Sequence, residues 1–388
     1  MKLNVDFGPG KLPISAPDDA AVLEFVDSPA ARDRVPVPEL VWRTLAAPLD
    51  MPPLRALVRP GATVTIAFDD PLRAPATVRA VLPVLLETLA GSGVTPDRLT
   101  LISANGMHRK FSAAELRAYL SPEVADAVGP ERIVNHDSTE AATLLDFGRT
   151  PLGGRVRHHR ALAESDLTIY VGNIGPNVWG GHGGTGAVIG LASAESIAHN
   201  HARDVIGAAE SCHGEQRRML YQRHKEAVAW QLEKSTGRQV FYVECIADER
   251  GVREVFAGHF AAIRRAAWPL ADRAFDVAAA PADVLVVGLP ERLLYGEVDN
   301  PLIALTGLGF PSRMWKGAPV LRRGGVVIGV SPSRGVVNAE SHPSYEHVIR
   351  LYAEAGSVKA LSAHEPGHLS RRHRYSASGR SARPPSSS

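Results

Sequence analysis

Short runs of β-branched and aliphatic residues alternate along the chain with stretches whose apolar residues recur at helical spacing. This alternation is typical of β-α-β units, which build mainly parallel sheets. The runs that predict strands are 63–68, 99–103, 167–172, 239–245, 284–288 and 326–330, and those that predict helices are 75–89, 112–120, 193–237 and 345–355. Ser112 and Glu115 also have the spacing of a capping box at the start of a helix. The pattern predicts an α/β fold.

A chain of 388 residues is long enough for two domains. We expect mainly parallel sheets flanked by helices, with a ligand crevice between the domains at the carboxyl ends of the strands. The predicted units are an N-terminal α/β domain, a C-terminal α/β domain and a disordered Ser/Arg/Pro tail, at 1–270, 283–365 and 366–388. The alanine-rich segment 271–282 is the candidate junction, although it can equally be a helix leading into the next strand.

Composition excludes several classes of protein. Two cysteines, Cys212 and Cys245, are too few for a disulfide scaffold or a four-cysteine zinc site. No apolar run reaches the length of a membrane span, and residues 1–11 lack the apolar core of a signal peptide. We therefore predict a soluble, cytoplasmic protein with no membrane partner.

The net charge does not indicate a nucleic-acid partner. The formal charge of +2 becomes −3 once the five arginines of residues 370–388 are set aside. A nucleic-acid-binding protein concentrates positive charge on its folded part, whereas here the charge lies in a segment with almost nothing to bury. A solvated appendage is the favoured interpretation, and a basic tail that binds RNA or DNA is the alternative.

Polar and chemically reactive residues come directly after three of the predicted strands. The segment 69–73 follows the first strand, 105–109 the second and 173–190 the third. The carboxyl ends of parallel strands share one edge of a sheet, and ligands bind in the crevice beyond it. We therefore expect these three segments to converge on one site.

The segment 69–73, DDPLR, admits two interpretations. Asp and Pro favour turns by backbone geometry alone, so the segment can be a turn without a chemical role. It can also present a carboxylate beside a guanidinium, because Arg73 is able to grip a carboxylate or a phosphate with its two-point fork. The sequence leaves both interpretations open.

Two further candidates are His108 and the glycine-rich segment 175–190. Arg109 beside His108 favours a neutral imidazole that can act as a general base, although a loop histidine without a role looks the same. The segment 175–190 has seven glycines in sixteen residues, which lets a backbone approach a ligand and offer N–H groups to anions. A flexible surface loop is the alternative, which the embedded Trp179 and His182 disfavour.

His199 and His201 follow the glycine-rich segment, in a region predicted to be helical. Side chains two positions apart on a helix point about 200° away from each other. At most one of these histidines can therefore face the site.

Taken in order, these segments resemble the lactate racemase family, whose enzymes use a nickel-pincer nucleotide. The matching segments are 7–11 (FGPGK), 69–73 (DDPLR), 106–109 (GMHR), 135–137 (NHD), 176–177 (PN), 183–186 (GGTG), 200–201 (NH), 300–302 (NPL) and 324–328 (GGVVI). The resemblance covers most of residues 5–355. It implies an isomerase, a racemase or epimerase that inverts a 2-hydroxy acid by hydride transfer to its cofactor.

The resemblance also implies roles for individual residues. His201 matches the nickel-ligating histidine, and imidazole is a chemically sensible nickel ligand. His108 matches one of two histidines that exchange a proton with the substrate hydroxyl, and Arg73 lines the substrate site. The residues expected to contact the cofactor are Asp70, Asn177, Gly183, Gly184 and Thr185.

Three positions depart from the family's pattern. Gly186 stands where the family has the lysine that tethers the cofactor, and residues 111–224 contain no lysine at all. Asn177 stands where the second proton-exchanging histidine is expected, and an amide is neither acid nor base near pH 7. A lysine expected near 295–299 is also missing. We therefore expect the cofactor to bind non-covalently, with His182 as the candidate second base.

Other functions compete with this one. A zinc-like metal held by His201 with His182 or His108 would make a hydrolase or lyase on the same scaffold. Loss of both the tether and a base is also what a catalytically decayed binding protein would show. A plain nicotinamide-dependent dehydrogenase is disfavoured, because the first strand leads into 69–73 rather than into a glycine fingerprint.

Overall fold

The computed structural model describes residues 1–23, 35–73, 75–208, 211, 219–248, 251–294, 297–309, 314–337, 343–357 and 360. The predicted tail, 366–388, and Cys212 lie outside these ranges. The fold is α/β, with mostly parallel sheets flanked by helices, as the sequence predicts. Within the described residues, no helix combines the length and the apolar character that a bilayer span requires.

The larger sheet has six strands in the order β10-β9-β8-β3-β4-β5. All neighbours in it are parallel except β10, which runs antiparallel to β9. The strands are β3 (Val64–Asp69), β4 (Leu99–Ala104), β5 (Ile133–Asn135), β8 (Leu167–Asn173), β9 (Phe241–Asp248) and β10 (Gly251–Gly258). The predicted strands at 63–68, 99–103, 167–172 and 239–245 are therefore confirmed, whereas the short strand β5 has no clear sequence pattern.

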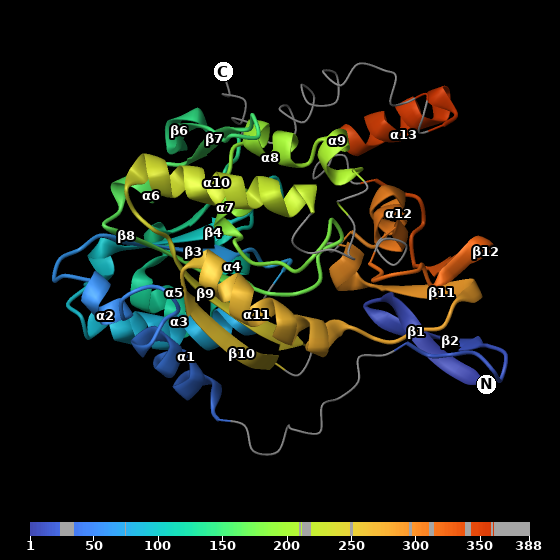
Figure 1. Cartoon of the computed structure of the whole chain (residues 1–388), viewed down its shortest axis with the longest axis horizontal. Coiled ribbons are helices and arrows are strands. Elements are labelled where there is room, and N and C mark those ends of the chain that lie inside the picture. The colour runs from blue at the N-terminus through green and yellow to red at the C-terminus, as the bar shows by residue number, and fades with distance from the viewer. Residues whose placement is uncertain are drawn as a thin grey trace, which may run out of the picture.

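Helices cover both faces of this sheet, and alternate residues of each strand point to opposite faces. In β3, Val64 and Phe68 pack with α1, α3, α4 and α5, whereas Ala67 packs on the other face with α6, α7, α10 and α11. Figure 1 shows α10 on the side of the sheet opposite α1 and α3. The helices are α1 (Val37–Ala46), α2 (Leu54–Leu57), α3 (Pro75–Ala90), α4 (Ala113–Leu120), α5 (Pro122–Val128), α6 (Ala161–Glu164), α7 (Ala187–Gly190), α8 (Ala194–Asn200), α9 (Arg203–Ile206), α10 (Leu220–Thr236), α11 (Phe260–Phe275), α12 (Pro301–Gly309) and α13 (Pro343–Ala355).

The capping box at the start of α4 is present as predicted. Ser112 accepts a hydrogen bond from the Glu115 N–H, and the Glu115 carboxylate accepts one from the Ser112 N–H. One-turn 3-10 helices connect several elements and are η2 (Pro96–Arg98), η3 (Pro130–Arg132), η4 (Ala141–Thr143) and η5 (Glu291–Leu294).

A second, four-stranded sheet has the order β12-β11-β1-β2. It joins the C-terminal strands β11 (Ala282–Pro290) and β12 (Leu321–Val330) to β1 (Lys2–Gly8) and β2 (Gly10–Ser15), with β1 parallel to β11. Figure 1 shows this sheet beside the larger one, with the N-terminus in it. The division at 1–270 and 283–365 stays a prediction, but β1, from the predicted N-terminal unit, pairs with β11 of the predicted C-terminal unit.

A two-stranded hairpin, β6 (Leu144–Arg149) and β7 (Arg155–His159), lies beside α10. The sequence predicts a surface position for His158 and His159, and for His158 this is wrong. His158 is fully buried and its Nε2 faces the Val188 carbonyl oxygen at 3.0 Å. The basic RVRHH run misleads because alternate residues of β7 point into the core.

The order of connections reverses between β3 and β8, and we call the carboxyl edge of the sheet at this point the crevice. From β3 the chain proceeds to β4 and β5 on one side, and later to β8 and β9 on the other. The helix that follows β3 lies on one face, and those that follow β8 lie on the opposite face. The loops after these two strands therefore diverge, and such a switch point leaves a crevice at the carboxyl edge.

Candidate functional site

Asp70 folds the segment after β3 into a turn that carries Arg73. Its Oδ1 accepts a hydrogen bond from the Leu72 N–H at 2.9 Å, and its carbonyl oxygen accepts one from the Arg73 N–H at 2.9 Å. The Asp70 side chain is 2% exposed, whereas Arg73 is exposed. The turn and the functional interpretation thus coexist, because the turn is what presents the guanidinium at the crevice.

The second oxygen of Asp70 binds His108, which follows β4. Asp70 Oδ2 lies 2.6 Å from His108 Nδ1, and His108 is 27% exposed. A carboxylate accepts only, so Nδ1 carries the proton in the neutral ring and Nε2 carries the lone pair. The sequence predicts a neutral His108 from its neighbour Arg109, but in the structure Arg109 pairs with Glu115. The carboxylate of Asp70 is what orients the imidazole.

Asp69 joins the ends of β3 and β8. Its Oδ1 accepts a hydrogen bond from the Tyr170 hydroxyl at 2.5 Å, and its Oδ2 accepts one from the Asn173 N–H at 2.9 Å. Burial raises the pKa of Asp69, and the two hydrogen bonds and Arg73 oppose this rise. Asp69 therefore fixes the two loops that border the crevice.

His201 lies just after α8, with one ring nitrogen already committed. Its Nδ1 faces the Ile197 carbonyl oxygen at 3.1 Å, which can only accept a hydrogen bond. The proton is therefore on Nδ1, and Nε2 presents a lone pair. The pKa of His201 is lowered to about 4, mainly by burial, with the positive charges of Arg73 and Lys225 acting in the same direction. His201 is thus a neutral imidazole close to Arg73.

His199 and His201 point in different directions, as the helical spacing predicts. His199 lies against His224 of α10, with ring centroids 5.2 Å apart. His201 lies against Tyr221, at 5.3 Å. Burial raises the pKa of Tyr221 to about 12, and the charge of Arg73 opposes this rise. Arg73 therefore acts electrostatically on His201 and on Tyr221, the ring that His201 contacts.

The glycine-rich segment is packed rather than a flexible surface loop. Gln222 of α10 donates to the Gly180 carbonyl oxygen at 2.7 Å, and Gly181 lies against Trp268 of α11. Many of its N–H groups are already used: that of Gly183 donates to the Gly175 carbonyl oxygen at 2.6 Å and that of Thr185 to the Glu244 carboxylate at 2.6 Å, for example. The predicted anion-binding role of this backbone thus has fewer available donors than the glycine count suggests.

Asn177, the predicted cofactor contact, stabilises the loop itself. Its Oδ1 accepts a hydrogen bond from the Trp179 N–H at 2.8 Å, and its own N–H donates to Gly181 at 2.9 Å. A hydrogen bond from Asn177 also lowers the pKa of Tyr221 against the effect of burial. Asn177 therefore links the loop to Tyr221, the residue that contacts His201.

Gly186 has no room for a side chain. A Cβ at this position would overlap the Tyr170 hydroxyl oxygen and lie 2.6 Å from Tyr170 Cε1. Tyr170 is 1% exposed and its hydroxyl is bonded to Asp69. The position where the resemblance expects a tethering lysine is thus closed by a side chain that cannot move freely.

His182, the predicted substitute base, is held by a carboxylate on α11. Its Nε2 lies 2.5 Å from Asp272 Oδ1, and Asp272 also pairs with Lys316 at 2.7 Å. His182 is fully buried, and this burial lowers its pKa although Asp272 opposes the shift. Its role as a base stays a prediction, but the structure contains a second histidine–aspartate pair besides His108–Asp70.

Two buried charged residues near His201 and the glycine-rich loop, Lys225 and Glu244, belong to none of the predicted site segments. Lys225 of α10 is 4% exposed and Glu244 of β9 is 2% exposed. A signal for each is present in the sequence. Lys225 lies four residues from the buried Tyr221 and four from the buried Ala229, on one face of the helix, and Glu244 interrupts an apolar strand.

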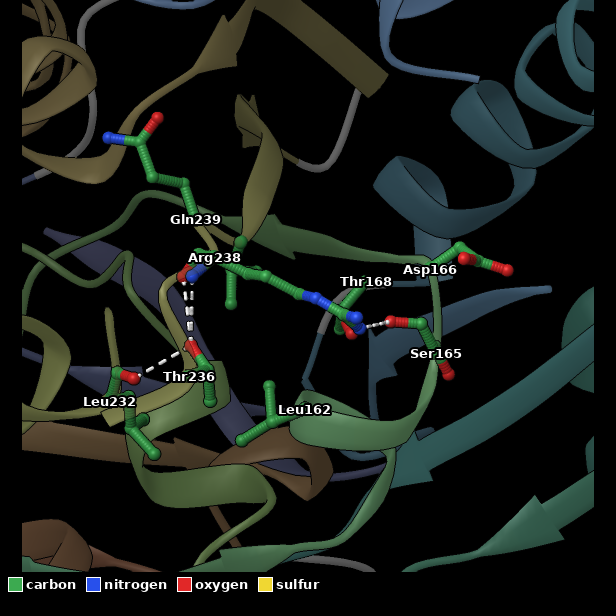
Figure 2. Close-up of a pocket in the computed structure, with 9 residues that line it drawn as sticks. Leu162, Ser165, Asp166, Thr168, Leu232, Thr236, Arg238 and Gln239 are labelled. Carbon is green, nitrogen blue, oxygen red and sulfur yellow. Dashed lines mark hydrogen bonds between the residues drawn. The ribbon is translucent and has the colours of Figure 1, made fainter. Parts of the chain in front are cut away.

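A small cavity lies at the opposite edge of the larger sheet. Figure 2 shows Arg238 reaching across it to Ser165, beside the segment that enters β8. With a volume of about 20 Å³ it has room for little more than a water molecule. It lies at the amino ends of β8 and β9 and is therefore separate from the crevice.

The donor set fits a metal that is held mainly by ligands from outside the protein. In the described part of the chain, no group of three or more His, Cys, Asp or Glu side chains is placed to hold a metal ion. His201 nevertheless offers one neutral imidazole with a lone pair on Nε2. A nickel ion already coordinated by a nucleotide needs only such a ligand. A catalytic zinc ion usually takes three protein ligands, so the structure adds no support for the hydrolase alternative.

Comparison with known proteins gives a consistent picture. A family model described as "Lactate racemase N-terminal domain" matches residues 7–214. A lactate racemase from Lactiplantibacillus plantarum is 28% identical over 252 residues, which are 64% of this chain and 57% of that protein. The matched segment thus spans less than two thirds of the relative's length.

Two solved structures resemble this fold. The lactate racemase apoprotein from Thermoanaerobacterium thermosaccharolyticum superposes with a TM-score of 0.71 at 19% identity, covering 97% of this chain and 84% of the other. A crystal structure of a protein from Thermotoga maritima superposes with a TM-score of 0.56 at 18% identity, covering 75% and 70%. At these identities the likeness is one of fold.

Proposed function

The chain belongs to the lactate racemase family, and on that premise we propose that it is a racemase or epimerase that inverts the hydroxyl-bearing carbon of a small 2-hydroxy acid. One arrangement carries the proposal. His108 held by Asp70, the guanidinium of Arg73 and the Nε2 lone pair of His201 come from segments that meet at the same crevice.

The implied cofactor is a nickel-pincer nucleotide, bound without a covalent tether. When bound, it supplies an acceptor for the hydrogen on the hydroxyl-bearing carbon, which is too weakly acidic for a histidine to remove. His201 is the residue that would ligate nickel, and Gly186 offers no side chain for attachment. The residues that would contact the nucleotide are Asp70, Asn177, Gly183, Gly184 and Thr185.

The chain's own residues supply substrate binding and proton transfer. Arg73 binds the carboxylate of the hydroxy acid through its two N–H donors. His108 takes the hydroxyl proton on Nε2, and Asp70 holds the ring in the tautomer that makes this possible. Asp70 also stabilises the imidazolium that forms, as carboxylates do in histidine pairs.

His182 is the second proton-exchanging group in this proposal. Asp272 orients its imidazole as Asp70 orients that of His108. The two histidines come from different segments: His108 follows β4, whereas His182 lies in the glycine-rich loop and its partner Asp272 on α11. Their different surroundings favour an asymmetric reaction, such as epimerisation of a larger hydroxy acid, over racemisation of lactate.

The test begins with the metal. The protein is co-expressed with a pathway that synthesises the pincer nucleotide, and its metal content and its native and denaturing masses are measured. We expect about one nickel per chain and a nucleotide-sized mass increase under native conditions only. His201→Ala should lose the nickel, while His199→Gln is the matched control and should keep it, because His199 points toward His224.

Turnover is then followed by chiral separation of a panel of 2-hydroxy acids. His108→Ala should keep nickel and lose turnover, which separates proton transfer from metal binding. Protein without nickel and without added mass would refute the proposal and leave a decayed binding protein as the better account. The cytoplasmic location and a small-molecule substrate are part of the same proposal.

A further inference from the structure

Lys225 and Glu244 bring opposite charges into the interior beneath the glycine-rich loop. They come from different elements, α10 and β9, and are 4% and 2% exposed. Burying two charged groups is costly, and an ion pair alone rarely offsets that cost. Their position therefore calls for an explanation beyond fold stability.

Both side chains bind the same peptide unit of the loop. Lys225 Nζ donates to the Gly184 carbonyl oxygen at 2.6 Å, and Glu244 Oε1 accepts from the Thr185 N–H at 2.6 Å. The carbonyl of Gly184 and the N–H of Thr185 are the two ends of one peptide bond. The two side chains thus fix its position and orientation from both ends.

This peptide unit has an unfavourable backbone conformation. Gly184 has a φ of +102° and Thr185 a φ of +54°, and a β-branched residue rarely adopts such a φ. A Cβ on Gly184 would lie 2.9 Å from Glu244 Oε2, so a side chain there would collide with the clamp. Such a conformation persists only where the surroundings impose it, and Lys225 and Glu244 are those surroundings.

Several other charges face the pair. Burial lowers the pKa of Lys225 to about 7, with Arg264 of α11 acting in the same direction, and burial raises the pKa of Glu244 to about 7. Asp69, at the end of β3, and Arg73, in the turn after it, act on Lys225 as well. The charge of Lys225 also lowers the pKa of His201, beyond the effect of burial. The pair is therefore electrostatically part of the crevice.

We propose that Lys225 and Glu244 are positioning residues of this site, a clamp that holds the Gly184–Thr185 peptide unit in place beside His201 and Arg73. The clamp keeps the loop in one conformation without a ligand, so a ligand meets a preformed border. The clamp residues reach the loop from α10 and β9. The loop itself contains no lysine, and the lysine that contacts it comes from α10. The inference concerns the ligand-free protein and does not depend on the proposed reaction.

The test measures amide hydrogen exchange in the ligand-free full-length protein, followed by mass spectrometry on overlapping peptides that contain Thr185. Loss of one clamp contact should speed exchange of this amide about ten-fold to a hundred-fold, the range expected for a lost hydrogen bond to a charged group. The variants are Lys225→Met and Glu244→Leu. Lys234→Met, an exposed lysine on the same helix, is the matched control and should leave exchange unchanged.

A conservative variant separates the clamp from simple packing. Glu244→Gln keeps an oxygen acceptor for the Thr185 N–H but does not titrate. It should retain most of the protection, and the change in protection expected in the wild type near pH 7, after correction for intrinsic exchange, should become smaller, because only Lys225 of the pair still titrates there. A packing residue would give neither the retention nor the altered pH profile.

The outcomes divide clearly. Faster exchange confined to the loop in Lys225→Met and Glu244→Leu supports the clamp, even if no nickel or turnover is ever found. Loop exchange in Lys225→Met equal to that in Lys234→Met overturns it, as does an increase spread evenly over the chain. If Lys225→Met does not fold, Glu244→Leu carries the test, because unchanged exchange of Thr185 there overturns the proposal equally.

Discussion

Gly186→Ala is the sharpest test of the loop geometry, because the backbone and the side-chain surroundings make opposite predictions. Gly186 has φ −59° and ψ −29°, an ordinary helical conformation. At such a position, replacing Gly by Ala should stabilise a protein by about 0.4–1 kcal/mol through the unfolded chain. Any loss of stability must therefore come from contacts of the added methyl group.

Those contacts are severe. The new Cβ would overlap the hydroxyl oxygen of Tyr170, which is 1% exposed and bonded to Asp69 at 2.5 Å. Overpacking costs about 1–3 kcal/mol, and disturbing the Tyr170–Asp69 hydrogen bond adds about 0.5–1.5 kcal/mol. After the backbone gain, we expect Gly186→Ala to lower the free energy of unfolding by roughly 0.5–4 kcal/mol.

The assay is urea denaturation followed by circular dichroism. Gly309→Ala is the control, since no atom lies within 4 Å of its added Cβ, and it should change stability by less than about 0.5 kcal/mol. Tyr170→Phe removes the nearest atom, so Gly186→Ala should cost less in that background, with a coupling of about 1 kcal/mol. A Gly186→Ala protein as stable as the wild type, or more stable, would refute the reasoning. Gly186→Lys should likewise fail to gain a covalent nucleotide mass.

Three further predictions follow from the site and the core. Asp70→Asn removes the carboxylate that holds His108, and the turnover proposed here should fall by about 10²-fold or more, well beyond any loss of nickel caused by the altered nucleotide contact; equal loss of both would mean that Asp70 acts through cofactor binding or the fold rather than through His108. Asn177→His should change turnover only weakly, and a large gain in lactate racemisation, measured by chiral separation, would show instead that the site has decayed. The free energy of unfolding, and with it the urea midpoint, should fall as the pH drops from 6.5 toward 4, because the unfolded chain binds protons that the buried imidazoles do not. The expected fall in free energy is about 1.4 kcal/mol per pH unit for each such histidine; a flat profile would contradict this. The histidines whose pKa burial lowers to about 4 are His136, His158, His159 and His201.

Local signals in the sequence identified most of the larger sheet. The strands β3, β4 and β8 are continuous apolar runs, which is what a strand covered on both faces requires. Ser112 and Glu115 marked the start of α4 because the capping box is a local interaction. The short strand β5 and the pairing of β1 with β11 were not found, since pairing partners far apart in sequence leave no local pattern.

The site divides in the same way. The sequence by itself determined which reactive residues follow which strands, and parallel strand ends then required Arg73, His108 and the glycine-rich segment to meet at one edge. Helical spacing determined that His199 and His201 diverge. Only the tertiary structure decided the partners: Asp70 for His108, Asp272 for His182, Tyr170 against Gly186, and the clamp of Lys225 and Glu244. All of these contacts join residues 16 or more positions apart, and their distance depends on how the helices and strands pack rather than on local sequence.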